Sequence, residues 1–190
     1  MINNRRKDTT APRNTEYVGV LYDQHAPRLL SICMRYTGNR EDAEDILHDG
    51  FIKIIRNIGT FNNRHERSLE AWMKRIIVNT ALNFLRDHKK EQFMLSLESS
   101  NNGLQVAEET GEESFSGLNL SKNELMDMIC ELPSGYRTVF NLYVMEEYSH
   151  REIAKLLSCS ENTSKSQLSK ARAFLRKRLE QYKNHEVYAQ

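Results

Sequence analysis

Two helices joined by a short turn, predicted near the C-terminus, constrain this chain more than any other feature. Ser149 can cap the first of them, and Glu152, three residues later, completes a capping box. An apolar stripe at helical spacing follows, until Ser158 interrupts it and Ser160 offers a second cap. The stripe consists of Ile153, Ala154, Leu156 and Leu157.

The second helix of this pair carries many cations. Its inward positions are Leu168, Ala171, Leu175 and Leu179. Its basic side chains are Lys165, Lys170, Arg172, Arg176, Lys177 and Arg178. A short helix, a tight turn and a longer basic helix form a helix-turn-helix, whose second helix enters the DNA major groove. The same pattern also suits an αα-hairpin with a solvated basic face, and these residues alone leave both readings open.

The net charge of +1 conceals an acidic segment beside a basic one. Residues 104–131 contain seven acidic side chains and one lysine, whereas residues 165–183 contain seven basic side chains and one glutamate. A basic end beside an acidic middle suggests a face that binds a polyanion, together with a tether that avoids it.

The cysteines and the apolar runs exclude several classes of protein. Cys33, Cys130 and Cys159 form no CxxC pair, which predicts free thiols in a reducing cytosol and neither a zinc site nor a disulfide framework. The apolar runs are too short for a signal peptide or a membrane span, so we expect a soluble cytoplasmic protein. No phosphate loop, nucleophile elbow or paired-carboxylate arrangement is visible, and we therefore expect neither an enzyme nor a cofactor.

The periodicity predicts an all-α chain with two small helical domains joined by a long acidic linker. We read residues 1–14 as a disordered basic tail, 15–90 as the first domain, 91–119 as a flexible linker and 120–183 as the second domain. The linker loses helical periodicity, and it is too long for a loop within one compact domain. We therefore expect two units that are tethered to one another and not fused.

One helix of the first domain, with Asn39 as its cap, has an acidic outer face. Its outward residues include Asp45, His48, Asp49 and Lys53. Asp45 and His48 have the spacing of a metal-ligand pair, but a di-metal bundle needs a second such pair and two further carboxylates, which the sequence lacks. We expect a surface for a protein partner, with simple solvation as the alternative.

A loop and the helix after it combine cations, carboxamides and an aromatic ring. The loop carries Phe61, Arg64, His65 and Arg67. Such a loop suits unstacked bases, although a loop phenylalanine often fills a core instead. Ser68 is expected to cap the next helix, whose outward set is Lys74, Arg75, Asn79, Asn83 and Arg86. Cations suit phosphates and Asn suits base edges, so this face suits nucleic acid, while Trp72 fits either that role or the core.

Two further helices are expected before the helix-turn-helix. The first has an apolar stripe that ends before Pro133. That stripe is Leu125, Met128, Ile129 and Leu132. The second is expected to offer Val139, Phe140, Tyr143 and Val144 to the core.

Three blocks of this sequence together resemble one known family. They are DAEDILHDGFIKIIRN, AWMKRIIVNTALNFLRDHKK and LPSGYRTVFNLYVMEEYSHREIAKLLSCSENTSKSQLSKAR. Their order and spacing are similar to those of the extracytoplasmic-function subfamily of bacterial RNA polymerase sigma factors. The resemblance covers about residues 16–179 and implies a promoter-specificity subunit that binds core polymerase, recognises two promoter elements and helps to melt DNA.

The resemblance also implies roles for individual residues. Contact with the clamp helices of the β′ subunit would fall to Asp45, His48, Asp49 and Phe51. Contact with the melted downstream promoter element would fall to Phe61, Arg64, His65, Arg67, Lys74, Arg75, Asn79, Asn83 and Arg86. Contact with the duplex upstream element would fall to Asn162, Thr163, Lys165, Ser166, Ser169, Lys170 and Arg172. The β flap and an inhibitory anti-sigma protein are the further partners that the family implies.

Three residues depart from the family pattern. His48 stands where the family often has Gln, and Ser164 where it often has Val. Gln167 replaces a frequent Arg, and this change would alter the preferred upstream sequence if the side chain contacts DNA. A stand-alone helix-turn-helix regulator is the alternative function, and it predicts tight, selective DNA binding without polymerase.

Overall fold

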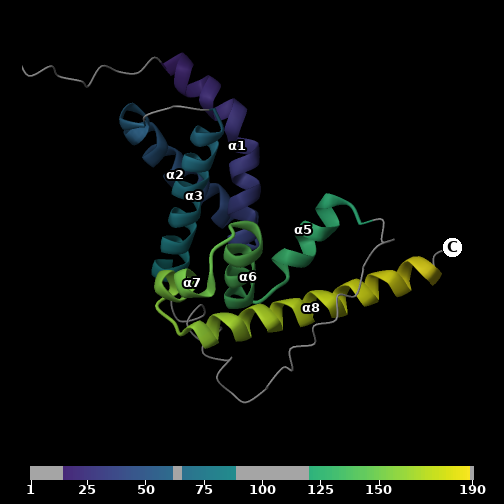
Figure 1. The fold of residues 1–190 in the computed structure, drawn as a ribbon. Coiled ribbons are helices and arrows are strands. Elements are labelled where there is room, and N and C mark those ends of the chain that lie inside the picture. Colours follow the sequence, from purple (N-terminus) through teal and green to yellow (C-terminus); the bar gives the residue numbers. More distant parts are fainter. Residues whose placement is uncertain (1–14, 62–65, 89–119, 189–190) are drawn as a thin grey trace, which may run out of the picture.

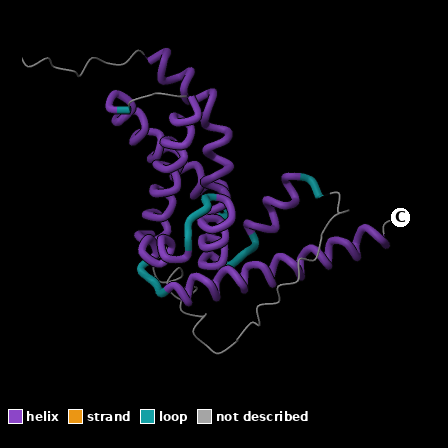
Figure 2. The backbone as a smooth tube through the Cα atoms, viewed as in Figure 1, coloured by secondary structure: helices purple, strands orange, loops and turns teal. Residues whose placement is uncertain are grey.

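The computed structural model describes residues 15–61, 66–88 and 120–188, and within them every regular element is helical. The expected all-α class is confirmed. The long helices of the N-terminal half stand side by side, and the last helix, residues 161–188, crosses beneath them (Figures 1 and 2). The tail and the linker expected over residues 1–14 and 91–119 lie outside the described residues.

The described residues of the first domain form three helices and one short 3₁₀ turn. Helix α1 (Thr15–Thr37) continues through Pro27, and α2 (Arg40–Asn57) leads into the 3₁₀ turn Ile58–Thr60. Asn39 caps α2 as expected, because its Oδ1 accepts the backbone N–H of Asp42 at 2.9 Å. Helix α3 (Glu66–His88) begins before Ser68, so the prediction of a cap at that residue is wrong.

The core of the first domain lies between α1, α2 and α3, and within it α2 and α3 approach each other closely. The fully or almost fully buried side chains of these two helices include Ala43, Ile46, Ile54, Met73, Ile77, Ala81 and Leu85. Gly50 of α2 faces Ile77 of α3, and a Cβ at position 50 would collide with the Cδ1 of Ile77. A side chain at position 50 would therefore force the end of Ile77 to move, and Gly50 lies on the side of α2 opposite to the acidic outer face.

The second domain is built from α5 (Lys122–Cys130), α6 (Ser134–Phe140), a π-helical turn (Asn141–Met145), α7 (His150–Leu157) and α8 (Glu161–Tyr188). Capping boxes begin both α5 and α7. A second apolar cluster fixes α5 against α8 and contains Met128, Leu132, Ala171 and Leu175.

The inward face of α6 and the π-helical turn differs from the sequence prediction. Val139 and Leu142 are fully buried, whereas Tyr143 is 36% and Val144 42% exposed. Leu125 and Leu156 are also exposed, contrary to the expected stripes. Periodicity could not indicate the true inward face, because part of it is polar and packs against α1.

The two domains are in contact in this structure. Val139, Leu142 and Ile153 of the second domain belong to the same apolar cluster as the core of the first. Hydrogen bonds also join α6 and the π-helical turn to the end of α1. The sequence predicted two units that are tethered and not fused, and in this conformation the two units also pack against one another.

Candidate protein and nucleic-acid interfaces

The outer face of α2 presents the acidic stripe that the sequence predicted. Asp45, His48 and Asp49 are exposed, and their i, i+3, i+4 spacing places them on one side of the helix. Phe51 has only 4% of its surface exposed, and its ring packs edge-on against Tyr22 at 4.8 Å between centroids. We therefore describe Phe51 as a core residue that supports α2, and the stripe available to a partner is the three polar residues.

The residues between α2 and α3 are described only in part. Phe61 is half-buried, and its ring lies 4.9 Å from that of Trp72, which is also half-buried. Arg64 and His65 lie outside the described residues, and of Arg67 the structure describes only its place in α3. The two aromatic rings therefore brace the start of α3 against the preceding turn.

The predicted nucleic-acid face of α3 divides into two parts. Arg75, Asn79, Asn83 and Arg86 are exposed and share one side of the helix, and the Nη2 of Arg86 donates to the Oδ1 of Asn83 at 3.1 Å. Lys74 is only partly exposed and turns instead toward α1 and the second domain. The continuous cation and carboxamide stripe therefore comprises four of the five predicted residues.

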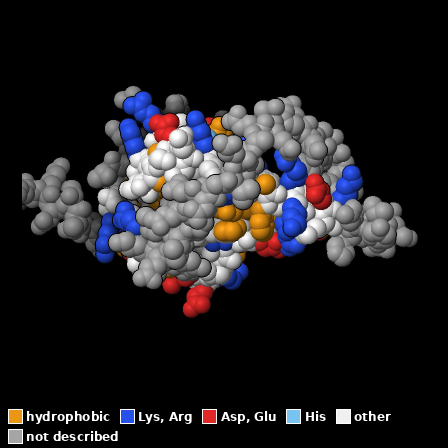
Figure 3. Space-filling model, turned by 90° about the horizontal axis from the view of Figure 1, so that it is seen from below, with side chains coloured by type: hydrophobic (Ala, Val, Ile, Leu, Met, Phe, Trp, Pro, Cys, Tyr) orange, Lys and Arg blue, Asp and Glu red, His pale blue; other side chains and the backbone are white. Residues whose placement is uncertain are grey.

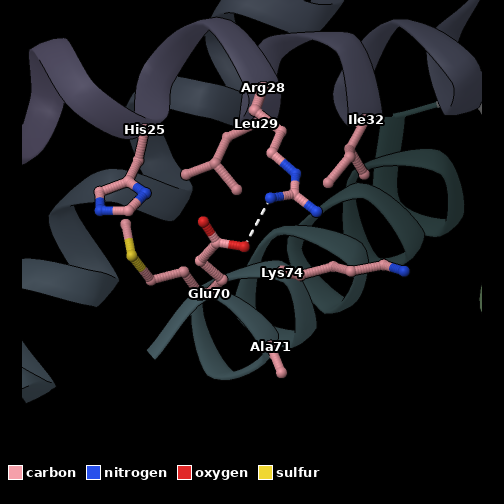
Figure 4. Close-up of a pocket in the computed structure, with 8 residues that line it drawn as sticks. His25, Arg28, Leu29, Ile32, Glu70, Ala71 and Lys74 are labelled. Atoms are coloured by element: carbon pink, nitrogen blue, oxygen red, sulfur yellow. Dashed lines mark hydrogen bonds and ion pairs between the residues drawn. The ribbon is translucent and has the colours of Figure 1, made fainter. Parts of the chain in front are cut away.

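A groove runs between α1 and α3 beside Lys74. Its cavity of about 370 Å³ is bridged by the ion pair of Arg28 and Glu70 (Figure 4). His25 and Lys74 lie toward opposite ends of the groove (Figure 4). The remaining lining residues are Leu29, Ile32, Ala71 and Met73.

The helix-turn-helix predicted from the sequence is present, and its turn is held by local hydrogen bonds. Ser149 and Glu152 form the predicted capping box of α7. Ser158 ends α7 in the left-handed conformation, with φ 52°. Ser160 then accepts the backbone N–H of Thr163 at 2.9 Å, as expected for a cap of α8.

The start of α8 exposes some of the residues predicted to contact DNA and buries others. Asn162, Lys165 and Arg172 are exposed, whereas Ser166, Ser169 and Lys170 are partly exposed. Thr163 is 9% exposed, because it participates in the cap of its own helix. Viewed from the side of α8, Lys and Arg side chains lie on both sides of an exposed hydrophobic patch (Figure 3).

Two of the departures from the family pattern lie inside the domain. Ser164 and Gln167 are both fully buried, so neither side chain is available to bases in this conformation. The Oγ of Ser164 instead lies 2.9 Å from the Nδ1 of His150, the first residue of α7. The idea that Gln167 alters sequence preference by direct contact therefore finds no support in this placement.

A stack of aromatic and cationic groups orients α8 against the rest of its domain. The ring of His150 stacks on Tyr143 at 4.5 Å, and the guanidinium of Arg172 lies 6.0 Å from the centre of the Tyr143 ring. Burial lowers the pKa of His150, and the cations of Lys165 and Arg172 lower it further. The neutral imidazole is therefore favoured beside this basic surface.

Polar residues that the sequence analysis did not select join the two domains. Arg137, Asn141 and Glu146 are polar or charged, yet the first two are buried and the side chain of the third is 5% exposed. Their positions within α6 and the π-helical turn give no sequence signal of a partner more than 60 residues away, because periodicity reports only which side of a helix is apolar.

Within the described part of the chain, no cluster of His, Cys, Asp and Glu is suited to hold a metal ion. In the same ranges no helix is both long enough and apolar enough to cross a membrane.

The sequence matches two known family descriptions and several characterised proteins. The family descriptions "Sigma-70 region 2" and "Sigma-70, region 4" match residues 21–91 and 122–175. The ECF RNA polymerase sigma factor SigW of Bacillus subtilis is 29% identical over 165 residues, which cover 84% of this chain and 87% of that protein. The ECF RNA polymerase sigma-E factor of Haemophilus influenzae is 26% identical over 167 residues, which cover 85% and 86%.

A solved structure is also similar. It is the sigma factor RpoE in complex with the anti-sigma factor NepR from Bartonella quintana, with 19% identity and a TM-score of 0.48. The match covers 87% of this chain and 98% of that one.

Proposed function

Because this chain belongs to the extracytoplasmic-function sigma factors, the promoter-recognition subunits of bacterial RNA polymerase, we propose a separate task for each of its exposed polar faces. The observation that carries the proposal is the presence of two cation and carboxamide surfaces in two different domains, on α3 and at the start of α8. A protein that binds two promoter elements at the same time needs two separate surfaces that can contact DNA.

The stripe of Asp45, His48 and Asp49 on α2 is the core-polymerase contact in this proposal. It is exposed, lies on one side of the helix and is backed by the buried face of α2, so that a partner would meet a rigid surface. The clamp helices of the β′ subunit are the partner that we assign to it, and the β flap would contact the second domain.

The α3 stripe is the contact for the downstream promoter element. Asn79 and Asn83 can hydrogen-bond to bases once the strands separate, and Arg75 and Arg86 can neutralise phosphates on either side. Unstacking a base costs a few kcal/mol. Side chains that bind the freed base would offset this cost, so the melting of the DNA duplex would depend on the promoter sequence.

The start of α8 is the contact for the upstream element, read as duplex in the major groove. Asn162 and Lys165 are exposed near the helix N-terminus, where base contacts occur in this motif, and Arg172 lies two turns further along for phosphate contact. We further propose that the protein acts with polymerase in the cytoplasm, and that an anti-sigma protein inhibits it by covering these faces.

In-vitro transcription with purified core polymerase and a library of genomic fragments tests the function. We expect specific start sites that appear only when this protein is added. The stand-alone regulator would instead bind its DNA tightly without polymerase and would repress transcription directed by other factors.

Asp49→Lys tests the assignment of the α2 stripe. It reverses the charge in the middle of the proposed contact without changing the buried face, and it should abolish binding to core polymerase while the helical circular dichroism stays unchanged. Asp23→Lys makes the same change at an exposed position of α1, outside the stripe, and is the matched control. If wild type and Asp49→Lys bound core polymerase equally well, the α2 stripe would not be the polymerase contact.

A further inference from the structure

The π-helical turn before α7 presents one aromatic ring at the surface. Leu142 in this turn is fully buried, whereas the next residue, Tyr143, is 36% exposed. The chain then folds back on itself: the N–H of Tyr148 donates to the carbonyl of Leu142 at 2.9 Å, and Glu147 adopts the left-handed conformation with φ 60°. This reversal brings the ring of His150, at the start of α7, onto that of Tyr143, with 4.5 Å between the ring centres.

The stacked pair meets α8 at two separate points. At one end, the Nδ1 of His150 lies 2.9 Å from the Oγ of Ser164, whose side chain is fully buried. At the other end, the guanidinium of Arg172 lies 6.0 Å from the centre of the Tyr143 ring, at the range of a cation–π contact. Ser164 and Arg172 are eight residues apart, so about 12 Å of helix separates the two points. The two rings therefore support more than two turns of α8.

The Tyr143 ring holds a cation that is otherwise free to act. Arg172 is exposed, and among the described residues no ion pair joins it to a carboxylate. A guanidinium that lies over a ring keeps N–H donors at its edge, which can bind phosphate oxygens in a bidentate way. Holding the side chain in advance also reduces the rotamer freedom that it loses when it binds.

The charge state of His150 suits such a support. Burial lowers its pKa, and the nearby cations of Lys165 and Arg172 lower it further, while the carboxylate of Glu161 has the opposite effect. The favoured neutral imidazole adds no charge of its own to the stack. Substitution of either ring by an uncharged side chain therefore changes the geometry around Arg172 and leaves the charge of this surface the same at neutral pH.

We propose that Tyr143 and His150 are positioning residues for a phosphate contact of Arg172 in the upstream promoter element. The stacked rings hold the guanidinium at the DNA backbone, while Asn162 and Lys165 at the start of α8 meet the bases. The rings act through Arg172 and not by touching DNA themselves. This inference deepens the proposed function and rests on it, since that function assigns the start of α8 to duplex DNA.

The salt dependence of DNA binding tests this assignment. Each phosphate that a cation neutralises contributes about 0.9 to the slope of log affinity against log salt concentration. The full-length chain is titrated with a short fluorescent duplex of random sequence at several low salt concentrations, because phosphate contacts do not depend on sequence. Arg172→Gln should lower the slope by about 0.9, and Tyr143→Leu should lower it by at least about half as much although it removes no charge.

Matched variants separate positioning from a general loss of structure. His150→Ala removes the ring that supports Tyr143 and should lower the slope as Tyr143→Leu does. Tyr143→Phe keeps the ring and should retain the wild-type slope. Val144→Ala truncates the neighbouring side chain, which is 42% exposed and outside the stack, and is the control that should also leave the slope unchanged. Helical circular dichroism checks that each variant is folded, and if one of the two ring deletions unfolds, the other decides.

A double variant tests whether the ring acts through the cation. In the Arg172→Gln background, Tyr143→Leu should not change the slope further, because the contact that the ring positions is already lost. A further decrease would mean that Tyr143 acts on DNA independently of Arg172, and it would overturn the proposal. A wild-type slope in Arg172→Gln, or in a folded ring deletion, would overturn it as well.

The outcomes separate this inference from the proposed function. Wild-type slopes in the ring deletions would refute the positioning role even if the protein directs transcription from specific start sites. Failure of the wild-type chain to direct transcription from any start site would instead refute the proposed function. The slopes on random-sequence DNA would then still report whether the stacked rings hold Arg172 for phosphate.

Discussion

Gly50→Ala is a sharp test of how α2 is positioned behind the proposed polymerase-binding stripe. Alanine at this position would place its Cβ against the Cδ1 of Ile77, whereas the next nearest atoms, Ile77 Cγ1 and Thr80 Oγ1, would lie at ordinary distances of 3.6 and 3.8 Å. Overpacking a core typically costs about 1–3 kcal/mol. Replacing glycine by alanine inside a helix gains about 1 kcal/mol. We therefore expect Gly50→Ala to lower the free energy of unfolding by about 0–2 kcal/mol.

Ile77→Val makes the argument specific, because valine lacks the one atom that collides. Alone it should cost about 0.5–1.5 kcal/mol for the lost methyl group. In the double variant the collision is gone and the helix gain of about 1 kcal/mol remains, so its stability should return to near that of the wild type. The coupling energy between the two sites should be about 1–3 kcal/mol, well above the scatter of about 0.3–0.5 kcal/mol seen for independent sites.

Urea unfolding followed by helical circular dichroism measures these four free energies. The slope with denaturant should be the same in all four proteins, so that midpoint differences report stability. Additive effects within about 0.5 kcal/mol would refute the reasoning, because they would mean that α2 and α3 do not meet at Gly50 and Ile77.

Three further perturbations test other parts of the structure. Ser149→Ala removes the side chain that caps α7 together with Glu152, and should lower the free energy of unfolding by about 1 kcal/mol in the same assay. Burial lowers the pKa of His150 below its usual value of 6.5, and the positive charge of Lys165 lowers it further. As the pH falls, the unfolded chain therefore binds a proton at this residue before the folded chain does. Stability should thus fall as pH drops below about 6.5, and His150→Gln should flatten this dependence; an unchanged pH profile would contradict the placement of the ring. Burial raises the pKa of Cys33 to about 12, so its thiol should react with iodoacetamide at pH 8 far more slowly in the native protein than after denaturation, as peptide mass spectrometry can measure.

Local patterns in the sequence were sufficient for the helix-turn-helix. The capping box at Ser149, the break at Ser158 and the cap at Ser160 each depend on atoms within a few residues. The acidic stripe of α2 was predictable for the same reason, because helical periodicity separates an apolar face from a polar one. The exposed side of α3 followed from the same rule, apart from Lys74.

Contacts between distant segments decided what periodicity could not. Arg137 and Asn141 lie on what a helical wheel marks as polar positions, yet they are buried, because the unpaired carbonyls at the end of α1 satisfy their donors. Lys74 is not part of the exposed nucleic-acid stripe, because it pairs with the carboxylate of Glu146, 72 residues later in the chain. Hydrophobic patterning by itself determined which helices form and which sides carry charge; the docking of the second domain on α1 decided which of those charges remain free, because pairing depends on geometry that no local pattern encodes.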